Sequence, residues 1–488
     1  MAEIGSGNNS SYPGGIDTNA TPEVNAPASN KTRARKEVVE DLTAVVIAIE
    51  NELGTDPAGS LSDVKTFLQL QHQTDGTHKS THGPHVYIDE ANYANFSAAV
   101  AAAPNKTLVV ARSINLDANT VIGSTVSLMP LNPGVINKNG FTLTINGPVV
   151  GDPKHQWLSG FAAGEVTFGL GANAIRTEWF GVKWDASIDC TNEFRLAISA
   201  CPNDGGIILP YGITIVSSEL SFANKYHINM TGVSMLGTRI QMSGQSVQPR
   251  SVISLVGAGY IKFSDFEIYS GDNTAYSPKS ILTLGRTSAG SFGQHKFSRF
   301  SVRGFCTVSA VYSVASEENS WDNVWVEVDG GGAQYAVWLS NTDGRGLGGY
   351  FASTNLSMWF SHCRLYVSSD SIGSATVYIQ AGPSSGDIVF RDSYFAAGNG
   401  SYVEFNLDTG GGYGNYTFSN IRGENIGTSV KRGFRFVVGS GTSIARLHIE
   451  DCNLDCSEYF IYGEDGSNVV NSFFCNNQTT NLPAGQQV

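Results

Sequence analysis

The chain has 488 residues, of which 41% are hydrophobic and only 15% charged, and this excludes a long disordered polyelectrolyte. Its 55 glycines and 16 prolines follow no Gly-x-y period, which excludes collagen and favours short strands joined by tight turns. The net charge is −13, no apolar run approaches the roughly 20 residues that span a bilayer, and residues 1–11 lack the regions of a signal peptide, so we expect neither nucleic acid nor membrane insertion.

The first predicted elements are an extended arm over residues 1–28 and a helical stem with its neck over 29–88. Four apolar residues of the stem step by 4, 3 and 4 positions, namely Val38, Leu42, Val45 and Ile49. This spacing predicts a helix over about 30–53, and a second helix is expected from Ser60. The seam suits a three-helix bundle if the rest of the chain trimerises, and a helix packed within one chain if it does not.

A metal site is one of two interpretations of the neck at residues 71–85, which holds four histidines. On a threefold axis His78, His82 and His85 would meet their own copies and bind a metal ion. The same Gly-, Pro- and Thr-rich stretch is also typical of a plain connection between modules. The seven cysteines are irregularly spaced and predict free thiols rather than disulfides or zinc ligands, so we expect no cofactor.

A six-residue pattern repeats in the second half of the chain and determines the predicted fold. Its order is apolar, any, small or polar, apolar, any, apolar, as in residues 263–268 and 297–302. Nine copies, 21 to 39 residues apart, begin at Met230, Phe263, Phe297, Trp321, Phe360, Phe390, Phe418, Ile449 and Val470. Another strand candidate lies between consecutive copies. Short strands in a unit of this length predict a parallel β-solenoid.

The third residue of each copy is predicted to lie at a corner between two strands. This corner column contains Asp265, Arg299, Asn323, His362, Asp392, Asn420, Asp451 and Ser472. Stacked strands are about 4.8 Å apart, so these side chains can form hydrogen-bond ladders along the solenoid. We therefore interpret the carboxylates and His362 as structural, with catalysis as the alternative.

Residues 178–216 resemble the opening of the pectate-lyase-superfamily domains of bacteriophage tailspikes and tail fibres. The matching residues are Trp179-Phe180-Gly181, Asp185, Asp189, Ala197-Ile198, Gly205-Gly206, Leu209-Pro210 and Gly212. Residues 143–148 are similar to the β-rich segment that precedes this domain, and residues 12–55 to phage fibre attachment regions. The chain departs from the family at its Asp-rich turn, 185–191, and it lacks the clustered aspartates of a pectate-lyase calcium site.

The resemblance implies an all-β protein: a right-handed parallel β-helix with a short N-terminal α-helical stem, assembled as a homotrimer. We expect an extended attachment arm (1–28), the stem and Gly/His-rich neck (29–88), a small β-rich segment (89–177) and the β-helix (178–488). The resemblance also implies a virion protein made in the host cytoplasm, attached to phage structural proteins through residues 1–85.

Outward positions on the strand after the corner supply the candidate glycan-binding residues. They are Trp325, Arg364, Tyr366, Tyr394 and Arg422. Flat rings stack on the C–H faces of sugars, and guanidinium groups bind the carboxylates of acidic glycans. The same stripe also suits a subunit interface or an unremarkable surface, and the sequence leaves these alternatives open.

The candidate catalytic pair is Glu327 and Asp329, which are two residues apart on one predicted strand. That spacing corresponds to roughly 6.5–7 Å, near the carboxylate separation of inverting glycosidases, and solvated surface acids are the alternative. The sequence thus predicts a virion tail fibre or tailspike-like protein that binds host cell-surface polysaccharide without cutting it. The alternative is a polysaccharide depolymerase, either a hydrolase or a lyase.

Overall fold

The structure is a computed structural model that describes residues 85–87, 93, 95–151, 153–172, 174–271, 276–286, 293–330, 334–340, 357–368, 375–380, 386–407, 414–438, 443–444, 446–463, 468–469 and 472–480. The chain divides into two compact units, Met1–Ala94 and Asn95–Val488. In the first unit the structure describes strand β1 (His85–Tyr87). The predicted arm, the helix over 30–53 and the helix from Ser60 lie outside the described residues.

The second unit begins with a short helix and three small parallel sheets. Helix α3 spans Phe96–Ala101, and the Asn95 side chain caps it by accepting a hydrogen bond from the Ala98 backbone N–H. The sheets pair β2 (Thr107–Val110) with β5 (Ser127–Pro130), then β3 (Ser113–Asn115), β6 (Val135–Asn137) and β8 (Leu158–Ser159), then β4 (Thr120–Ile122), β7 (Leu143–Ile145) and β9 (Val166–Phe168). Parallel stacking of coils therefore already begins at β2.

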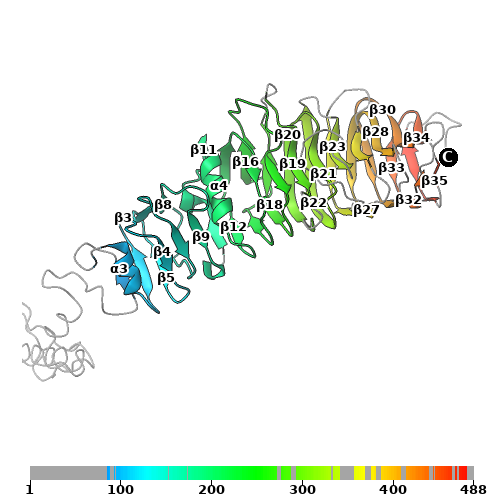
Figure 1. The fold of residues 1–488 in the computed structure, drawn as a ribbon. Helices are drawn as coiled ribbons and strands as arrows, with labels where there is room; N and C mark the ends of the chain where they lie inside the picture. Colours follow the sequence, from blue (N-terminus) through cyan, green and yellow to red (C-terminus); the bar gives the residue numbers. More distant parts are fainter. Residues whose placement is uncertain are drawn as a thin grey trace, which may run out of the picture. The chain divides into compact units, whose positions relative to one another are not determined.

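Strands β10 to β37 continue this stacking as one 26-stranded sheet wound into coils with three faces (Figure 1). The first face contains β10 (Ala174–Arg176), β12 (Gly206–Ile208), β15 (Asn229–Thr231), β24 (Met358–Ser361), β27 (Asp387–Arg391), β29 (Asn415–Ser419), β32 (Arg446–Glu450) and β36 (Ser472–Cys475). The second face contains β11 (Asp185–Asp189), β13 (Gly212–Val216), β16 (Thr238–Met242), β25 (Arg364–Val367), β33 (Asn453–Asp455) and β37 (Gln478–Thr480). The third face contains β14 (Leu220–Ser221), β17 (Ile253–Val256), β19 (Ser280–Gly285), β21 (Ser309–Val314), β23 (Tyr335–Ser340), β26 (Ala375–Gln380) and β34 (Tyr459–Gly463).

Five longer strands turn a corner and contribute to two faces. Strands β18 (Lys262–Tyr269), β20 (Lys296–Phe305) and β22 (Asn319–Gly330) run from the first face to the second, and β28 (Tyr394–Leu407) and β30 (Arg422–Val438) from the second to the third. Strands β31 (Ser443–Ile444) and β35 (Asn468–Val469) form a separate pair. The parallel pairing confirms the predicted all-β parallel β-helix, while its right-handed sense and the trimer stay predictions.

The core contains a column of aromatic rings at the first position of the repeat. Phe263 pairs in register with Phe297, and the column continues through Trp321, Phe360, Phe390 and Phe418. The rings of Phe360 and Phe390 are 4.5 Å apart and nearly parallel, and those of Phe390 and Phe418 are 5.3 Å apart. Because each coil repeats the last at strand spacing, an aromatic residue at one inward position stacks on its equivalent in the next coil.

The corner column adopts the left-handed backbone conformation, which explains its polar composition. Seven predicted members have φ between 47° and 62°: Asp265, Arg299, Asn323, His362, Asp392, Asn420 and Asp451. Asn and Asp tolerate this region better than most residues, since their short side chains bond locally. Corner side chains also bond between coils, as in the Arg299 guanidinium on Asp265 (2.6 and 2.7 Å) and the Asn420 amide on Asp392 (2.7 Å).

The predicted register is wrong in the first and last copies of the repeat. In the first copy, residues 233–237 are an insertion: Val233 is 61% exposed, and the strand resumes at the buried Thr238. In the last copy the corner residue is Asn476 (φ 54°) rather than Ser472. Asn477 occupies the position that the buried Cys452 has in the previous coil. Its side chain accepts a hydrogen bond from the Cys452 N–H and donates one to the Ile449 carbonyl (both 3.0 Å). A polar residue therefore lies where the pattern requires an apolar one.

The residues that resemble the phage family form the opening of the β-helix and have structural roles. The Trp179 indole is buried and donates to the Pro153 carbonyl at 2.7 Å. Asp189 lies just before helix α4 (Thr191–Ala200) and accepts hydrogen bonds from Thr191 and Ser217. Two short 3₁₀ helices, η1 (Leu170–Ala172) and η2 (Thr177–Phe180), come before α4 in the chain. Gly212 has φ +129°, and a Cβ there would lie 2.1 Å from the Trp184 carbonyl, so this position requires glycine.

A buried histidine between coils makes stability depend on pH. His295 is fully buried, its Nδ1 accepts from the Ile261 N–H at 3.2 Å, and burial lowers its pKa from 6.5 to about 3. Between these values the unfolded chain binds a proton that the folded chain excludes, so stability falls as pH is lowered from about 6.5 to about 3. We expect the free energy of unfolding of wild type, measured by urea titration, to fall more steeply across this window than that of His295→Gln, by about 1.4 kcal/mol per pH unit. Parallel pH profiles would contradict this role.

Candidate functional site

The candidate site is the outward surface of the second face, here called the ladder face. Its first column is Glu267, Ser301, Trp325, Arg364, Tyr394, Arg422 and Asn453, and its second is Tyr269, Arg303, Glu327, Tyr366, Ala396 and Glu424. The structure thus places all five predicted glycan-binding residues on neighbouring coils of one surface. The first column ends at Gln478, which pairs in register with Asn453.

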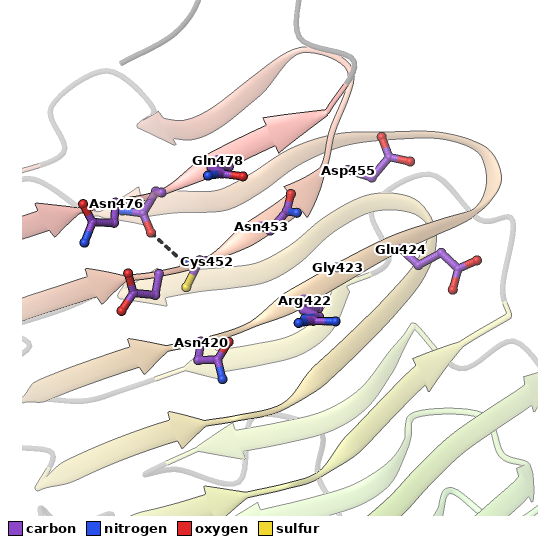
Figure 2. A pocket seen from close by; sticks show the side chains of 11 residues that line it. Asn420, Arg422, Gly423, Glu424, Cys452, Asn453, Asp455, Asn476 and Gln478 are labelled. Atoms are coloured by element: carbon purple, nitrogen blue, oxygen red, sulfur yellow. Dashed lines mark hydrogen bonds between the residues drawn. The ribbon is translucent and has the colours of Figure 1, made fainter.

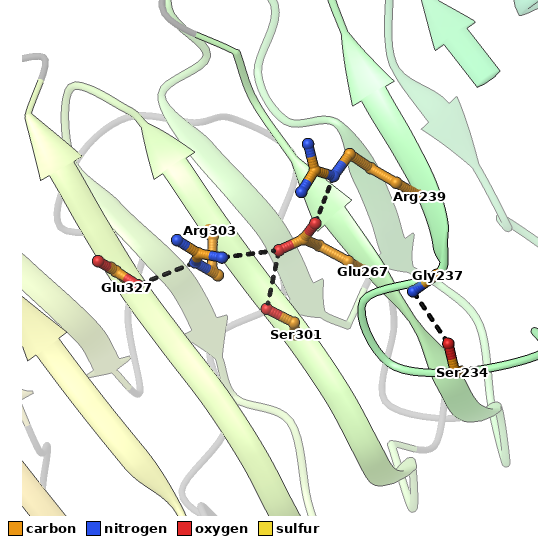
Figure 3. A network of polar contacts seen from close by, with 7 residues as sticks. All are labelled: Ser234, Gly237, Arg239, Glu267, Ser301, Arg303 and Glu327. Atoms are coloured by element: carbon orange, nitrogen blue, oxygen red, sulfur yellow. Dashed lines mark hydrogen bonds and ion pairs between the residues drawn. The ribbon is translucent and has the colours of Figure 1, made fainter. Parts of the chain in front are cut away.

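Charges of alternating sign cover the beginning of the ladder face (Figure 3). Glu267 is fully buried and accepts hydrogen bonds from Arg239 on one side and from Arg303 Nη1 on the other, at 3.3 Å for Arg303. The Ser301 hydroxyl adds a third bond at 3.3 Å, and Arg303 Nε donates to Glu327 at 2.8 Å. A buried carboxylate between two guanidinium groups is compensated, so this network holds Arg303 in place.

Guanidinium groups and aromatic rings alternate along the middle of the ladder face. Arg303 lies 4.3 Å from the Trp325 ring centroid, and Arg364, from the strand on the other side, lies 5.1 Å from it. Arg364 also lies 5.3 Å from the ring centroid of Tyr394. Cation–π contacts of this kind fix the orientation of a guanidinium group without consuming its hydrogen-bond donors. The Trp325 ring therefore contacts arginines from both neighbouring strands, while Arg364 remains exposed.

The predicted catalytic pair lies beside Tyr366 on this face. Glu327 is bound by Arg303, and burial together with the charges of Glu327 and Asp329 raises the pKa of Tyr366. A β-bulge interrupts the strand at this point, because Gly304 pairs with Val328 and Phe305 with Gly330, which leaves Asp329 as the extra residue. Regular strand alternation therefore does not set the separation of Glu327 and Asp329, and their catalytic role stays a prediction.

A polar groove lies where the ladder face reaches the last coils (Figure 2). Its volume is about 760 Å³. Its lining combines amides, carboxylates and one guanidinium group, from Asn420, Arg422, Glu424, Asp451, Asn453, Asp455, Asn476, Asn477 and Gln478, with Gly423 and Cys452. Amide groups both donate and accept hydrogen bonds, so the groove matches a ligand that carries many hydroxyl groups. Of these residues, sequence reasoning had selected Arg422 alone for ligand binding.

The predicted histidine metal site falls mostly outside the described part of the chain. His78 and His82 lie outside it, and His85 begins strand β1. Among the described residues, no three His, Cys, Asp or Glu side chains form a group able to hold a metal ion, and no helix is long and apolar enough to cross a membrane. All seven cysteines are free, and burial raises the pKa of Cys363 and Cys452 to about 12, which keeps these thiols protonated.

Comparison with known proteins gives structural similarity only. No family model and no curated protein matches the chain. The solved structures similar to it include Geobacillus virus E2 ORF18 (14% identity, 75% of each chain covered, TM-score 0.44) and the Streptococcus pneumoniae surface adhesin PfbA (10%, 63% of this chain and 93% of that one, 0.36). They also include the bacteriophage CBA120 tailspike protein 2 (10%, 63% and 46%, 0.38). The fold assignment rests on the strand pairing described above.

Proposed function

We propose that the chain is a bacteriophage tail fibre or tailspike-like protein that binds host cell-surface polysaccharide through the ladder face and its terminal groove. The observation that carries this proposal is the stack of rings and guanidinium groups leading into the groove. Arg364 is exposed, is held against Trp325 and Tyr394, and has no ion pair within the described chain. Arg422 lies two strands further along the same column and lines the groove.

The composition of the site favours a glycan with spaced acidic groups over a uniformly anionic polymer. Arg239 and Arg303 are already bound to Glu267 and Glu327. Arg364 and Arg422 therefore remain available to bind acidic groups of a ligand. Two strand spacings separate these arginines, about 9.6 Å. Glu424 and Asp455 line the groove as well, and their carboxylates would accept hydrogen bonds from sugar hydroxyls while repelling adjacent negative groups.

The proposal includes assembly and location. Residues 1–85 attach the protein to phage structural proteins, and the β-helix belongs to a homotrimer on the virion, as the resemblance at 178–216 implies. Sedimentation should give a mass three times the 52.0 kDa of one chain, and the mass of a single chain would contradict the trimer. A variant lacking residues 1–85 should stay folded and fail to join particles, and its incorporation would contradict the attachment role.

Replacing Arg364 tests the ladder face. We expect Arg364→Ala to weaken binding of host polysaccharide about tenfold, since one desolvated charge-assisted contact corresponds to roughly 1.4 kcal/mol. Arg364→Lys should not restore it, because an ammonium group neither stacks on two rings nor forms a bidentate contact. Arg299→Ala, an exposed arginine on the corner, is the matched control and should bind like wild type. Equal affinities of the Arg364→Ala and wild-type proteins in calorimetry would contradict the proposal.

One observation favours the depolymerase as a second candidate. Glu327, Asp329 and Tyr366 lie close enough for the two carboxylates to raise the tyrosine pKa. Glycoside hydrolysis requires a proton donor beside a carboxylate, and Arg303 Nε holds the Glu327 carboxyl group at 2.8 Å. In a hydrolase Glu327 would be one of the two catalytic carboxyl groups, and Glu327→Gln would abolish release of fragments.

A further inference from the structure

Trp359 differs from the other tryptophans of the chain because its indole contacts neither an aromatic ring nor a guanidinium group of the described residues. Five of the seven tryptophans contact other aromatic rings, and Trp325 contacts arginines. Trp359 lies on β24, is 38% exposed and makes no ring contact with the described chain. It points outward from the first face, three residues before the corner residue His362, and so does not belong to the ladder face. An exposed indole without a partner is available to a ligand.

Small neighbours leave a hollow beside this indole. In register, Trp359 stands between Ser320 and Val389, and Thr417 follows Val389. None of these side chains reaches as far from the sheet as an indole does. The result is a cavity of about 460 Å³, here called the Trp359 hollow, with Trp359, Val389 and Thr417 among its lining residues.

Polar groups lie at opposite rims of the Trp359 hollow. Asp387 and Arg391 also line it and flank Val389 on β27, two residues away on either side. Their backbones are therefore about 13 Å apart, too far for a direct ion pair across the cavity. Asp387 accepts a hydrogen bond from the Asn415 amide at 2.7 Å, which orients the carboxylate. Arg391 is exposed and has no ion pair within the described chain.

We propose that the Trp359 hollow is a second sugar-binding site, separate from the ladder face, that takes one pyranose residue of a host glycan. The C–H face of the sugar stacks on the indole. Asp387 and Asn415 bind its hydroxyls at one rim, and Arg391 binds a hydroxyl or an acidic substituent at the other. The proposal does not depend on the ladder face, because the two surfaces lie on different faces and share no residue.

Protection of Trp359 from a water-soluble quencher tests the proposal with the full-length chain. Acrylamide quenching of wild type, minus that of Trp359→Phe, isolates the Trp359 signal. The probes are the methyl glycosides of glucose, galactose, mannose, N-acetylglucosamine and glucuronic acid. We expect at least one to protect Trp359 in wild type and equally in Arg364→Ala, and to bind about tenfold more weakly to Asp387→Asn. Tyr211→Ala, which removes another exposed ring (72%), is the matched control and should retain protection.

Three results would overturn the proposal. Absence of protection by all five glycosides would show that the hollow does not bind a pyranose. Loss of protection in Arg364→Ala would show that binding belongs to the ladder face. A lower sedimentation mass for Trp359→Ala or for the milder Trp359→Phe than for wild type would show that another copy of the chain covers this face. Failure of the ladder face alone would leave protection by the glycosides intact.

Discussion

Phe390→Ala is expected to lower the free energy of unfolding by about 3–5 kcal/mol, the range for truncating a buried phenylalanine. Phe390 is fully buried and stacks between Phe360 and Phe418, and Phe395 meets its edge at 5.6 Å. Backbone pairing holds the coils on both sides at strand spacing, so they cannot close around the missing ring. The loss therefore combines the transfer free energy of the ring with the energy of a retained cavity.

Urea unfolding measures this effect, and Phe473→Ala is the matched control. Phe473 is a phenylalanine on the same face that is 52% exposed, so its truncation should change stability by less than about 1 kcal/mol. Equal losses for Phe390→Ala and Phe473→Ala would contradict the inward stack. Phe390→Leu should lie between wild type and Phe390→Ala, since it retains part of the buried volume.

Glu267→Ala is expected to cost about 3 kcal/mol, at the low end for breaking a buried ion pair. The substitution leaves Arg239 and Arg303 facing each other without the carboxylate that both now contact. The low end applies because these arginine side chains are 28% and 22% exposed, so water partly solvates them. Circular dichroism during urea unfolding gives the measurement.

A double variant separates the charge effect from simple loss of packing. Glu267→Met with Arg303→Met replaces the pair by apolar groups of similar length, and should recover at least half of the stability lost in Glu267→Ala. If the double variant is less stable than Glu267→Ala, the ion pair itself adds net stability, rather than only compensating the burial of its two charges. That result would contradict the assignment of this network as a positioning device.

Much of the fold follows from the repeat, because a solenoid imposes the same requirements on each coil. The position of Phe263 predicts that of Phe297 and so on to Phe418, and the corner positions need a left-handed backbone that Asn and Asp tolerate. The pattern fails where a coil departs from the average. The insertion at 233–237 and the amide-bonded coil at Asn477 satisfy their backbone by local contacts that no apolar pattern encodes.

The candidate site was less predictable than the fold. Alternation along the strand placed Trp325, Arg364 and Tyr394 in one column, and the register agrees. It could not show that Arg303 lies against Trp325, because side-chain direction between columns depends on the neighbouring charges. The sequence did not single out Trp359, because it precedes the corner. There the repeat pattern specifies only the inward apolar residues, such as the neighbouring Phe360.

The most direct test of the account is chromatography of host polysaccharide with the purified full-length protein, with light scattering to measure the polymer's mass. The polysaccharide comes from the bacterial strain infected by particles that carry the protein. With wild type, we predict that the polymer co-elutes with the protein and keeps its original mass. With Arg364→Ala at a concentration near the wild-type Kd, we predict that the polymer and the protein elute separately. Fragments of lower mass would contradict a non-cutting fibre and establish the depolymerase, and an unshifted polymer with wild type would contradict binding altogether.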